Sequence, residues 1–148
     1  MKTYIFKTQL QFAKKIQREI EMPEDATLYS LAAAVIHAYA FDFDHAFGFF
    51  SKISERWDFD TGDQYELFAD LKQRGIEQTG SKSVKKTKIL QVWKQPKDQM
   101  LFLFDYGDEW RFIITLKKFG VYVSKRKYPL VLDTKGEAPK QYPMEEDE

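Results

Sequence analysis

The chain has 148 residues, a length that suits a single domain with one hydrophobic core. Its 23 basic and 23 acidic side chains cancel, so no net charge draws the whole protein to nucleic acid or to an anionic membrane. Cysteine is absent, which excludes disulfides, thiolate metal sites and a cysteine nucleophile.

The start of the chain alternates apolar and polar residues, which is the period of a half-buried strand. The alternation runs from Tyr4 to Phe12, with Phe12 on the apolar face, and resumes from Ile16 to Met22 after the polar step Lys14-Lys15. Pro23 has no N–H to donate to a ladder, so the second strand should end there. The pattern predicts a β-hairpin.

A helix should follow the hairpin. Thr27 is placed to cap it, because apolar residues recur at spacings of three and four from Leu28 to Tyr39. We interpret His37 as a partly exposed helix residue without a ligand role. After the corner Phe41–His45, the segment Ala46–Phe50 could form a third strand. The order strand, strand, helix, strand predicts an α+β fold with a β-grasp-like ββαβ opening.

Residues 55–83 contain few apolar side chains. We interpret them as a loop region inserted in the domain, with one short helix from Gln64 to Arg74. Thr87 is placed to cap another short helix, from Lys88 to Trp93.

A central β-hairpin is predicted by two apolar runs, Met100–Phe104 and Phe112–Leu116, on either side of the segment Asp105–Trp110. Gly107 would supply the positive φ that the reversal of the chain needs, because glycine carries no Cβ. The tip of this hairpin is acidic.

Two interpretations of that tip remain open. In the structural one, Asp105 and Asp108 accept hydrogen bonds from nearby backbone N–H groups and Trp110 packs in the core. In the functional one, both carboxylates line a concave site together with Asp42, Asp44 and His45, from the corner between the helix and the third strand. Oxygen ligands of this kind would suit a hard divalent cation or receive a basic partner.

The motifs of several enzyme classes are missing. No serine lies in a nucleophile-elbow context, and only His37 and His45 could act as an imidazole base. The 7 glycines never approach the spacing of a phosphate-binding or dinucleotide-binding loop. We therefore assign no catalytic residue and leave open whether the protein is an enzyme, and we predict no metal ligand and no cofactor.

Basic residues gather in two places, with Tyr122 and Tyr128 near the second. A solvated face is the plainer interpretation, and a nucleic-acid surface is the alternative. The residues concerned are Lys82, Lys85, Lys86, Lys88, Lys125, Arg126 and Lys127.

The domain should cover residues 1–142, with an acidic, disordered tail at 143–148. Met1-Lys2-Thr3 leads into alternating residues rather than the continuous apolar segment of a signal peptide. No run approaches the roughly 20 apolar residues of a membrane span. We expect a cytoplasmic protein that does not use a membrane.

Four parts of the sequence, which together span most of the chain, carry a family resemblance. They are Tyr4–Lys7 with Ala26–Leu28, Phe41–His45, Phe104–Trp110, and Tyr128–Pro129 with Leu132–Pro139. In these segments the chain resembles the plasmid pRi ORF-three-like protein family, whose members also occur as passenger proteins of insertion elements. The tyrosine-glycine-aspartate hairpin that ends in tryptophan is the most specific part.

The resemblance implies a compact α+β domain and no known reaction. The polar residues that the chain shares with the family are Asp44, His45, Asp105, Asp108 and Asp133. The chain departs from the family at Phe112, where many members have histidine, and over Ala138–Tyr142, where many have a glycine-rich end that contains cysteine.

We predict a binding or interaction module for an unknown protein or peptide partner. Its surface would be formed by Asp105, Gly107, Asp108 and Trp110, together with Asp44, His45 and Asp133. The alternatives are a metal-assisted hydrolase or nuclease that uses the clustered carboxylates with His45, and an accessory protein that binds nucleic acid through the basic clusters.

Overall fold

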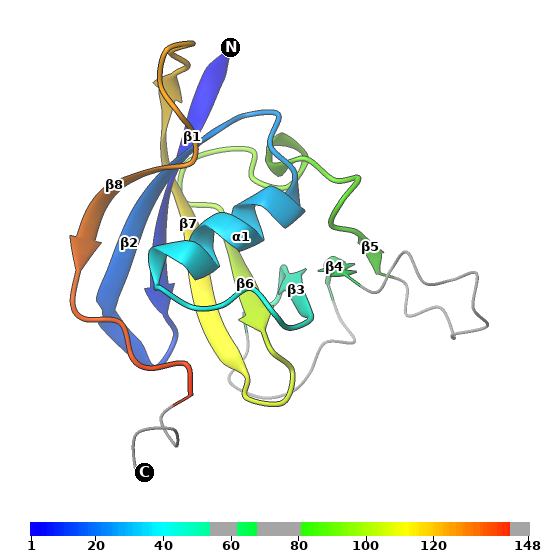
Figure 1. Cartoon of the computed structure of the whole chain (residues 1–148). Coiled ribbons are helices and arrows are strands. Elements are labelled where there is room, and N and C mark those ends of the chain that lie inside the picture. The colour runs from blue at the N-terminus through cyan, green and yellow to red at the C-terminus, as the bar shows by residue number, and fades with distance from the viewer. Residues whose placement is uncertain (54–61, 68–80, 143–148) are drawn as a thin grey trace.

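A computed structural model describes residues 1–53, 62–67 and 81–142 of the chain. Within these residues eight strands form one sheet, which curves around one α-helix (Figure 1). The strand order is β5-β4-β3-β6-β7-β1-β2-β8, and all neighbours are antiparallel except β4 and β5. The elements are β1 (Lys2–Leu10), β2 (Ala13–Pro23), α1 (Leu28–Ala38), β3 (Phe47–Phe50), β4 (Gln64–Glu66), β5 (Lys82–Ser83), the 3₁₀ helix η2 (Ile89–Gln91), β6 (Gln99–Phe104), β7 (Trp110–Val121) and β8 (Leu130–Lys135).

The N-terminal hairpin is confirmed, but its turn lies earlier than the sequence suggests. Leu10 pairs with Ala13, so Gln11 and Phe12 form the turn, while Lys14-Lys15 belongs to β2. Phe12, expected on the buried face, is 68% exposed at the tip. The alternation of the first strand therefore continues in the sequence beyond the point where the strand ends.

The helix α1 begins as predicted. Thr27 Oγ1 accepts a hydrogen bond from the N–H of Ser30 at 3.1 Å, which satisfies one of the unpaired donors of the first turn. Two more of these donors bond to a passing loop, from Leu28 N to Thr87 O at 2.9 Å and from Tyr29 N to Val84 O at 3.1 Å. The backbone N–H groups of Leu28, Tyr29 and Ser30 therefore all have acceptors within the protein.

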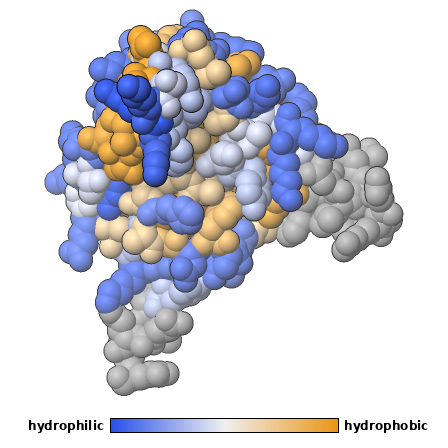
Figure 2. Space-filling model, turned by 45° about the horizontal axis from the view of Figure 1, so that its top comes forward, coloured by the Kyte–Doolittle hydropathy of each residue, from blue (hydrophilic) through white to orange (hydrophobic). Residues whose placement is uncertain are grey.

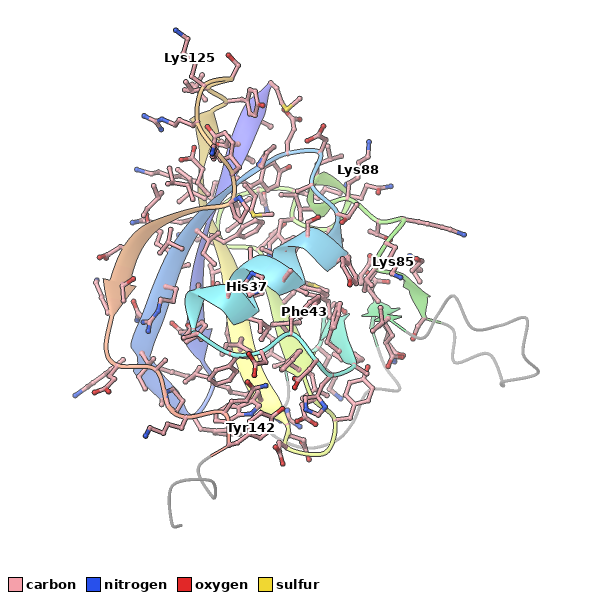
Figure 3. All side chains as sticks on the ribbon, in the orientation of Figure 1. His37, Phe43, Lys85, Lys88, Lys125 and Tyr142 are labelled. Atoms are coloured by element: carbon pink, nitrogen blue, oxygen red, sulfur yellow. The ribbon has the colours of Figure 1, made fainter. Side chains whose placement is uncertain are left out.

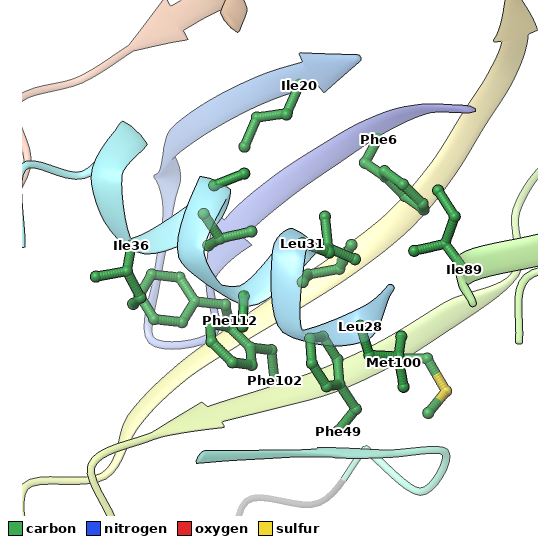
Figure 4. Packing of buried hydrophobic residues seen from close by; sticks show 14 of the residues in the cluster. Phe6, Ile20, Leu28, Leu31, Ile36, Phe49, Ile89, Met100, Phe102 and Phe112 are labelled. Carbon is green, nitrogen blue, oxygen red and sulfur yellow. The ribbon is translucent and has the colours of Figure 1, made fainter. Parts of the chain in front are cut away.

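The core between α1 and the sheet is largely aromatic. Leu28, Leu31 and Ile36 face phenylalanines of the sheet (Figure 4). The rings of Phe49 and Phe102 stack with their centroids 4.8 Å apart. Each aromatic ring occupies a large volume, so a few rings fill the space between the curved sheet and the helix. One helix is therefore enough to cover this face of the sheet.

Three local predictions are corrected or limited. Gln64–Glu66 forms the strand β4 rather than the start of a helix, and most of the remainder of that predicted helix lies outside the described residues. Lys82–Ser83 pairs with β4 as the strand β5, so part of the predicted loop region extends the sheet. The second short helix is one 3₁₀ turn capped at Lys88 rather than Thr87, because the Thr87 hydroxyl donates to Ser83 O at 2.6 Å instead.

The fold is an α+β arrangement dominated by one mixed sheet. The opening order strand, strand, helix, strand is present, but β3 lies between β4 and β6 and not beside the N-terminal hairpin, so the sheet order does not confirm a β-grasp-like arrangement. No helix in the described part of the chain is long and apolar enough to cross a membrane.

Candidate functional site

Four segments meet at one end of the molecule, which we call the hairpin end. They are the β1–β2 turn, the α1–β3 corner (residues 39–46), the β6–β7 turn (residues 105–109) and the C-terminal segment Ala138–Tyr142, which crosses this end after β8 (Figure 1). The N–H of Gln11 donates to Arg111 O at 2.9 Å, which ties the two hairpin turns together. Figure 3 shows Tyr142 at this end, below α1.

The β6–β7 turn is shaped by Asp105 and not by Gly107. Asp105 has a φ of +65° and Glu109 a φ of +52°, whereas Gly107 has no positive φ. Aspartate tolerates this conformation because its side chain can bond to the local backbone, and Asp105 Oδ1 accepts from the N–H groups of Gly107 at 3.1 Å and Asp108 at 3.3 Å. The prediction of a glycine pivot is wrong.

The acidic residues of this turn therefore have different environments. Asp105 is 7% exposed, which agrees with the structural interpretation for this residue. Glu109 bonds through Oε1 to Arg111 Nη2 at 2.9 Å. Asp108 and Glu109 are both exposed, so two carboxylates of the turn face solvent, and Glu109 is the one paired with Arg111.

The α1–β3 corner meets the turn at His45. Its Nε2 atom lies 3.4 Å from Asp105 Oδ2 and 3.5 Å from Asp44 Oδ1. The same atom lies 2.7 Å from the hydroxyl of Tyr142. The structure thus brings together Asp44, His45 and Asp105 from the predicted set and adds a tyrosine from the far end of the chain.

Tyr142 has a raised pKa. Desolvation, the hydrogen bond to Asp44 and the charges of nearby carboxylates raise the pKa of its hydroxyl to about 12. At neutral pH the hydroxyl is therefore protonated and donates to Asp44 at 3.0 Å. Its oxygen is then left to accept from His45 Nε2.

Gln141 fixes the C-terminal segment to the corner. Its side-chain amide bonds to both backbone groups of Asp42, accepting from the N–H at 2.7 Å and donating to the oxygen at 3.1 Å. The residue is 8% exposed. A satisfied, buried amide of this kind positions one segment against another.

Two cavities flank the C-terminal segment, and Pro139 lines both. The larger, of about 430 Å³, is lined by Tyr39, Ala40, Asp42, Ala138, Pro139, Lys140, Gln141 and Tyr142. The smaller, of about 300 Å³, lies between the hairpin turns and is lined by Leu10, Phe12, Ala13, Ile16, Asp108, Glu109, Trp110, Arg111 and Pro139. We call the smaller one the Trp110 cavity.

Trp110 is only half-buried, which departs from the core position of the structural interpretation. Its ring packs edge-on against Phe41, with the centroids 4.8 Å apart. Its Nε1 atom is buried and has no hydrogen-bond partner among the described residues. A buried donor of this type is rare, because losing its water without a replacement costs about 1–3 kcal/mol.

The other predicted residues lie elsewhere. Asp133 is on β8, where it pairs with Glu19 of β2, and its Oδ1 accepts from Thr134 N at 2.9 Å. It does not join the site, because β8 lies at the edge of the sheet, two strands beyond β1 and three beyond β7. No group of three or more His, Asp or Glu side chains in the described ranges is arranged to hold a metal ion.

The basic clusters are also separate from the hairpin end. Figure 3 shows Lys125 at the opposite end from Tyr142, with Lys85 and Lys88 at the side. Lys85 Nζ lies 5.3 Å from the ring centroid of Tyr29. Figure 2 turns the end with the β7–β8 loop toward the viewer, where hydrophilic surface is interrupted by apolar patches.

Sequence reasoning missed Gln141 and Tyr142. They lie 97 to 99 positions from their partners in the α1–β3 corner, in a segment without helical or strand periodicity. The departure from the family over Ala138–Tyr142 marks this segment in the sequence, but it assigns no contact to either residue.

The model of the plasmid pRiA4b ORF-3-like protein family matches residues 2–142, which confirms the resemblance. No curated protein matches the chain. A crystal structure of MM3350, a protein of unknown function from Methanosarcina mazei Go1, is similar with a TM-score of 0.74 and 21% identity, over 95% of this chain and 72% of that one. At this identity the likeness shows the fold alone.

The role of Asp105 can be tested by substitution. We expect Asp105→Ala to lower the free energy of unfolding by about 1–3 kcal/mol, because it removes the acceptor of two N–H groups at a positive φ. Asp105→Asn keeps an acceptor and tolerates this φ, so it should lose less than about 1 kcal/mol. Urea unfolding measures both losses. The control is the exposed Asp108→Ala, whose free energy of unfolding should stay within about 0.5 kcal/mol of that of the natural chain. Equal losses for Asp105→Ala and Asp105→Asn would contradict this role.

The Tyr142 hydroxyl should make stability depend on pH in the alkaline range. Its pKa is raised in the folded state, so its contribution is fully present below the unfolded pKa of about 10 and is lost as pH rises to about 12. We expect the stability difference between the natural chain and Tyr142→Phe to be constant from about pH 7 to 9 and to decline from about pH 10 to 12. Urea unfolding across this range measures it, and a difference that does not change with pH would refute the assignment.

Proposed function

This chain belongs to the plasmid pRiA4b ORF-3-like protein family, and we propose that it is a non-catalytic binding module for a peptide segment of another protein. The hairpin end is the recognition surface. An apolar side chain of the partner enters the Trp110 cavity, and a neighbouring basic side chain pairs with Asp108. The observation that carries this proposal is an open cavity of about 300 Å³ between two hairpin turns, with an exposed phenylalanine at its edge.

The exposed aromatic residue supports binding. Phe12 is 68% exposed at the tip of the β1–β2 turn and lines the Trp110 cavity. Burying apolar surface contributes roughly 25 cal/mol per Å², and aromatic anchors dominate many interfaces. Covering the Phe12 ring with a partner would therefore stabilise the complex, because the ring stays exposed to water in the free chain.

Charge supports a basic partner. Asp108 and Glu109 are both exposed at the cavity edge, but Glu109 already pairs with Arg111, so we assign Asp108 to the basic side chain of the partner. An exposed ion pair contributes only about 0.2–1 kcal/mol, so Asp108 would select and orient the partner while the apolar contact supplies most of the affinity.

The geometry favours this function over the two alternatives. His45 Nε2 already lies 2.7 Å from the Tyr142 hydroxyl, and the carboxylates around it form no metal-holding group in the described part of the chain. The basic clusters lie away from the hairpin end. On the family's plasmid association and the absence of cysteine, we further propose that the module acts in the cytoplasm as a protein carried by mobile elements.

A phage-displayed library of random peptides tests the proposed function. We expect selected peptides to carry an aliphatic or aromatic residue next to lysine or arginine. Phe12→Ser should weaken their binding at least about tenfold, since it removes an aromatic contact. Asp108→Lys should weaken it about three- to fivefold at low salt and less at high salt.

Matched controls lie at the other end of the molecule. Val121→Ser changes an equally exposed apolar residue, which is 76% exposed, and Asp25→Lys changes an exposed carboxylate in the β2–α1 loop. Both should leave the affinity unchanged. No enrichment of peptides, or equal losses in the variants and their controls, would overturn the proposal.

A further inference from the structure

The C-terminal segment Ala138–Tyr142 lies across the hairpin end as a peptide would. It belongs to no helix or strand and runs between the two cavities, both of which Pro139 lines. It follows β8 through Gly136, whose φ is +78°, and the exposed Glu137. The segment thus enters the site from the edge of the sheet.

Two side chains of the segment make polar contacts with the α1–β3 corner. The Gln141 amide brackets the backbone of Asp42, with bonds of 2.7 and 3.1 Å, as a neighbouring strand would. The Tyr142 hydroxyl donates to Asp44 at 3.0 Å and lies 2.7 Å from His45 Nε2. The corner therefore binds the glutamine through the backbone of Asp42, and it binds the tyrosine through the side chains of Asp44 and His45.

The segment adds little to the core. Ala138 is only partly buried against the main cluster, and none of the residues from 139 to 142 belongs to it. Cavities of about 430 and 300 Å³ remain on either side. Release of the segment would leave the packed rings beneath α1 in place.

From these contacts we infer that the segment is a resident ligand. The α1–β3 corner is a recognition site for a Gln-Tyr sequence in a partner protein, and the chain's own Gln141 and Tyr142 occupy it when that partner is absent. This inference rests on the proposed function, because the partner's apolar residue would fill the adjacent Trp110 cavity. A tethered ligand acts at an effective concentration of about millimolar, so the natural chain should bind an external copy weakly.

Fluorescence anisotropy with the full-length chain tests this inference. The probe is a labelled peptide with the sequence of residues 136–142, and the control peptide replaces its Gln with Ala and its Tyr with Phe. We expect the double variant Gln141→Ala/Tyr142→Phe to bind the probe at least about tenfold more tightly than the natural chain does, because the competing segment is weakened. The control peptide should bind the double variant at least tenfold more weakly than the probe, since it lacks the hydrogen-bonding groups.

Further arms make each outcome decisive. Adding Asp44→Ala to the double variant should abolish binding of the probe. If the double variant keeps its thermal transition but binds no probe, or binds both peptides equally, the segment is purely structural. The single variant Tyr142→Phe keeps the ring and should bind the probe with an affinity between those of the natural chain and the double variant. It provides the test if the double variant does not fold.

The selected phage peptides separate this inference from the proposed function. Binding of those peptides by the double variant, without binding of the Gln-Tyr probe, would sink only the inference. If the natural chain selects no peptides at all, both the proposed function and the inference fail. Light scattering is applied to the double and single variants as well. A dimer formed by exchange of the segment would overturn the external partner, because the occupant of the corner would then be a second copy of the chain.

Discussion

The carboxylate of Asp105 holds the hairpin end together. One of its oxygens accepts the two N–H groups of its own turn, and the other lies 3.4 Å from His45 Nε2. Its backbone N–H donates to Ala46 O at 2.9 Å. Turn and corner are thereby joined through one buried residue, and the positions of Asp108, Trp110 and Tyr142 follow from that junction.

This arrangement assigns separate tasks to residues that look alike in the sequence. Asp105 is buried and stabilises the turn, Glu109 is exposed and paired with Arg111, and Asp108 is exposed. Trp110 packs its ring on Phe41 while it lines a cavity on the outside. A binding surface of this kind needs a rigid base, because each flexible side chain that a partner must order lowers its affinity.

Local patterns predicted much of the fold. Alternation predicted the β1–β2 hairpin, two apolar runs around a turn segment predicted the β6–β7 hairpin, and spacings of three and four after Thr27 predicted α1. These signals all arise within a few residues of each other. The strand β4 was mistaken for a helix because three residues are too few to display a period. The positive φ went to Asp105 rather than Gly107 because a side-chain hydrogen bond replaced the freedom of glycine.

The site was less accessible to sequence reasoning. Asp44, His45 and Asp105 were grouped on chemistry, and the structure brings them together; Asp133 was grouped with them on resemblance alone and lies on the edge strand. Gln141 and Tyr142 could not be found, since contacts across nearly a hundred residues leave no local periodicity. The exposure of Phe12 was hidden for a simpler reason: an apolar residue at a strand end looks the same whether the strand continues or turns.

The indole N–H signal of Trp110 gives the most direct measurement of recognition at the hairpin end. This N–H is buried beside the cavity and has no hydrogen-bond partner in the part of the chain that the structure describes, whereas the indole of Trp93 donates to Ile114 O at 3.2 Å inside the core. In ¹H–¹⁵N correlation spectra, assigned with Trp110→Phe, a bound peptide should shift the Trp110 signal and leave that of Trp93 unchanged. Binding that leaves the Trp110 signal in place would contradict the assignment of this surface.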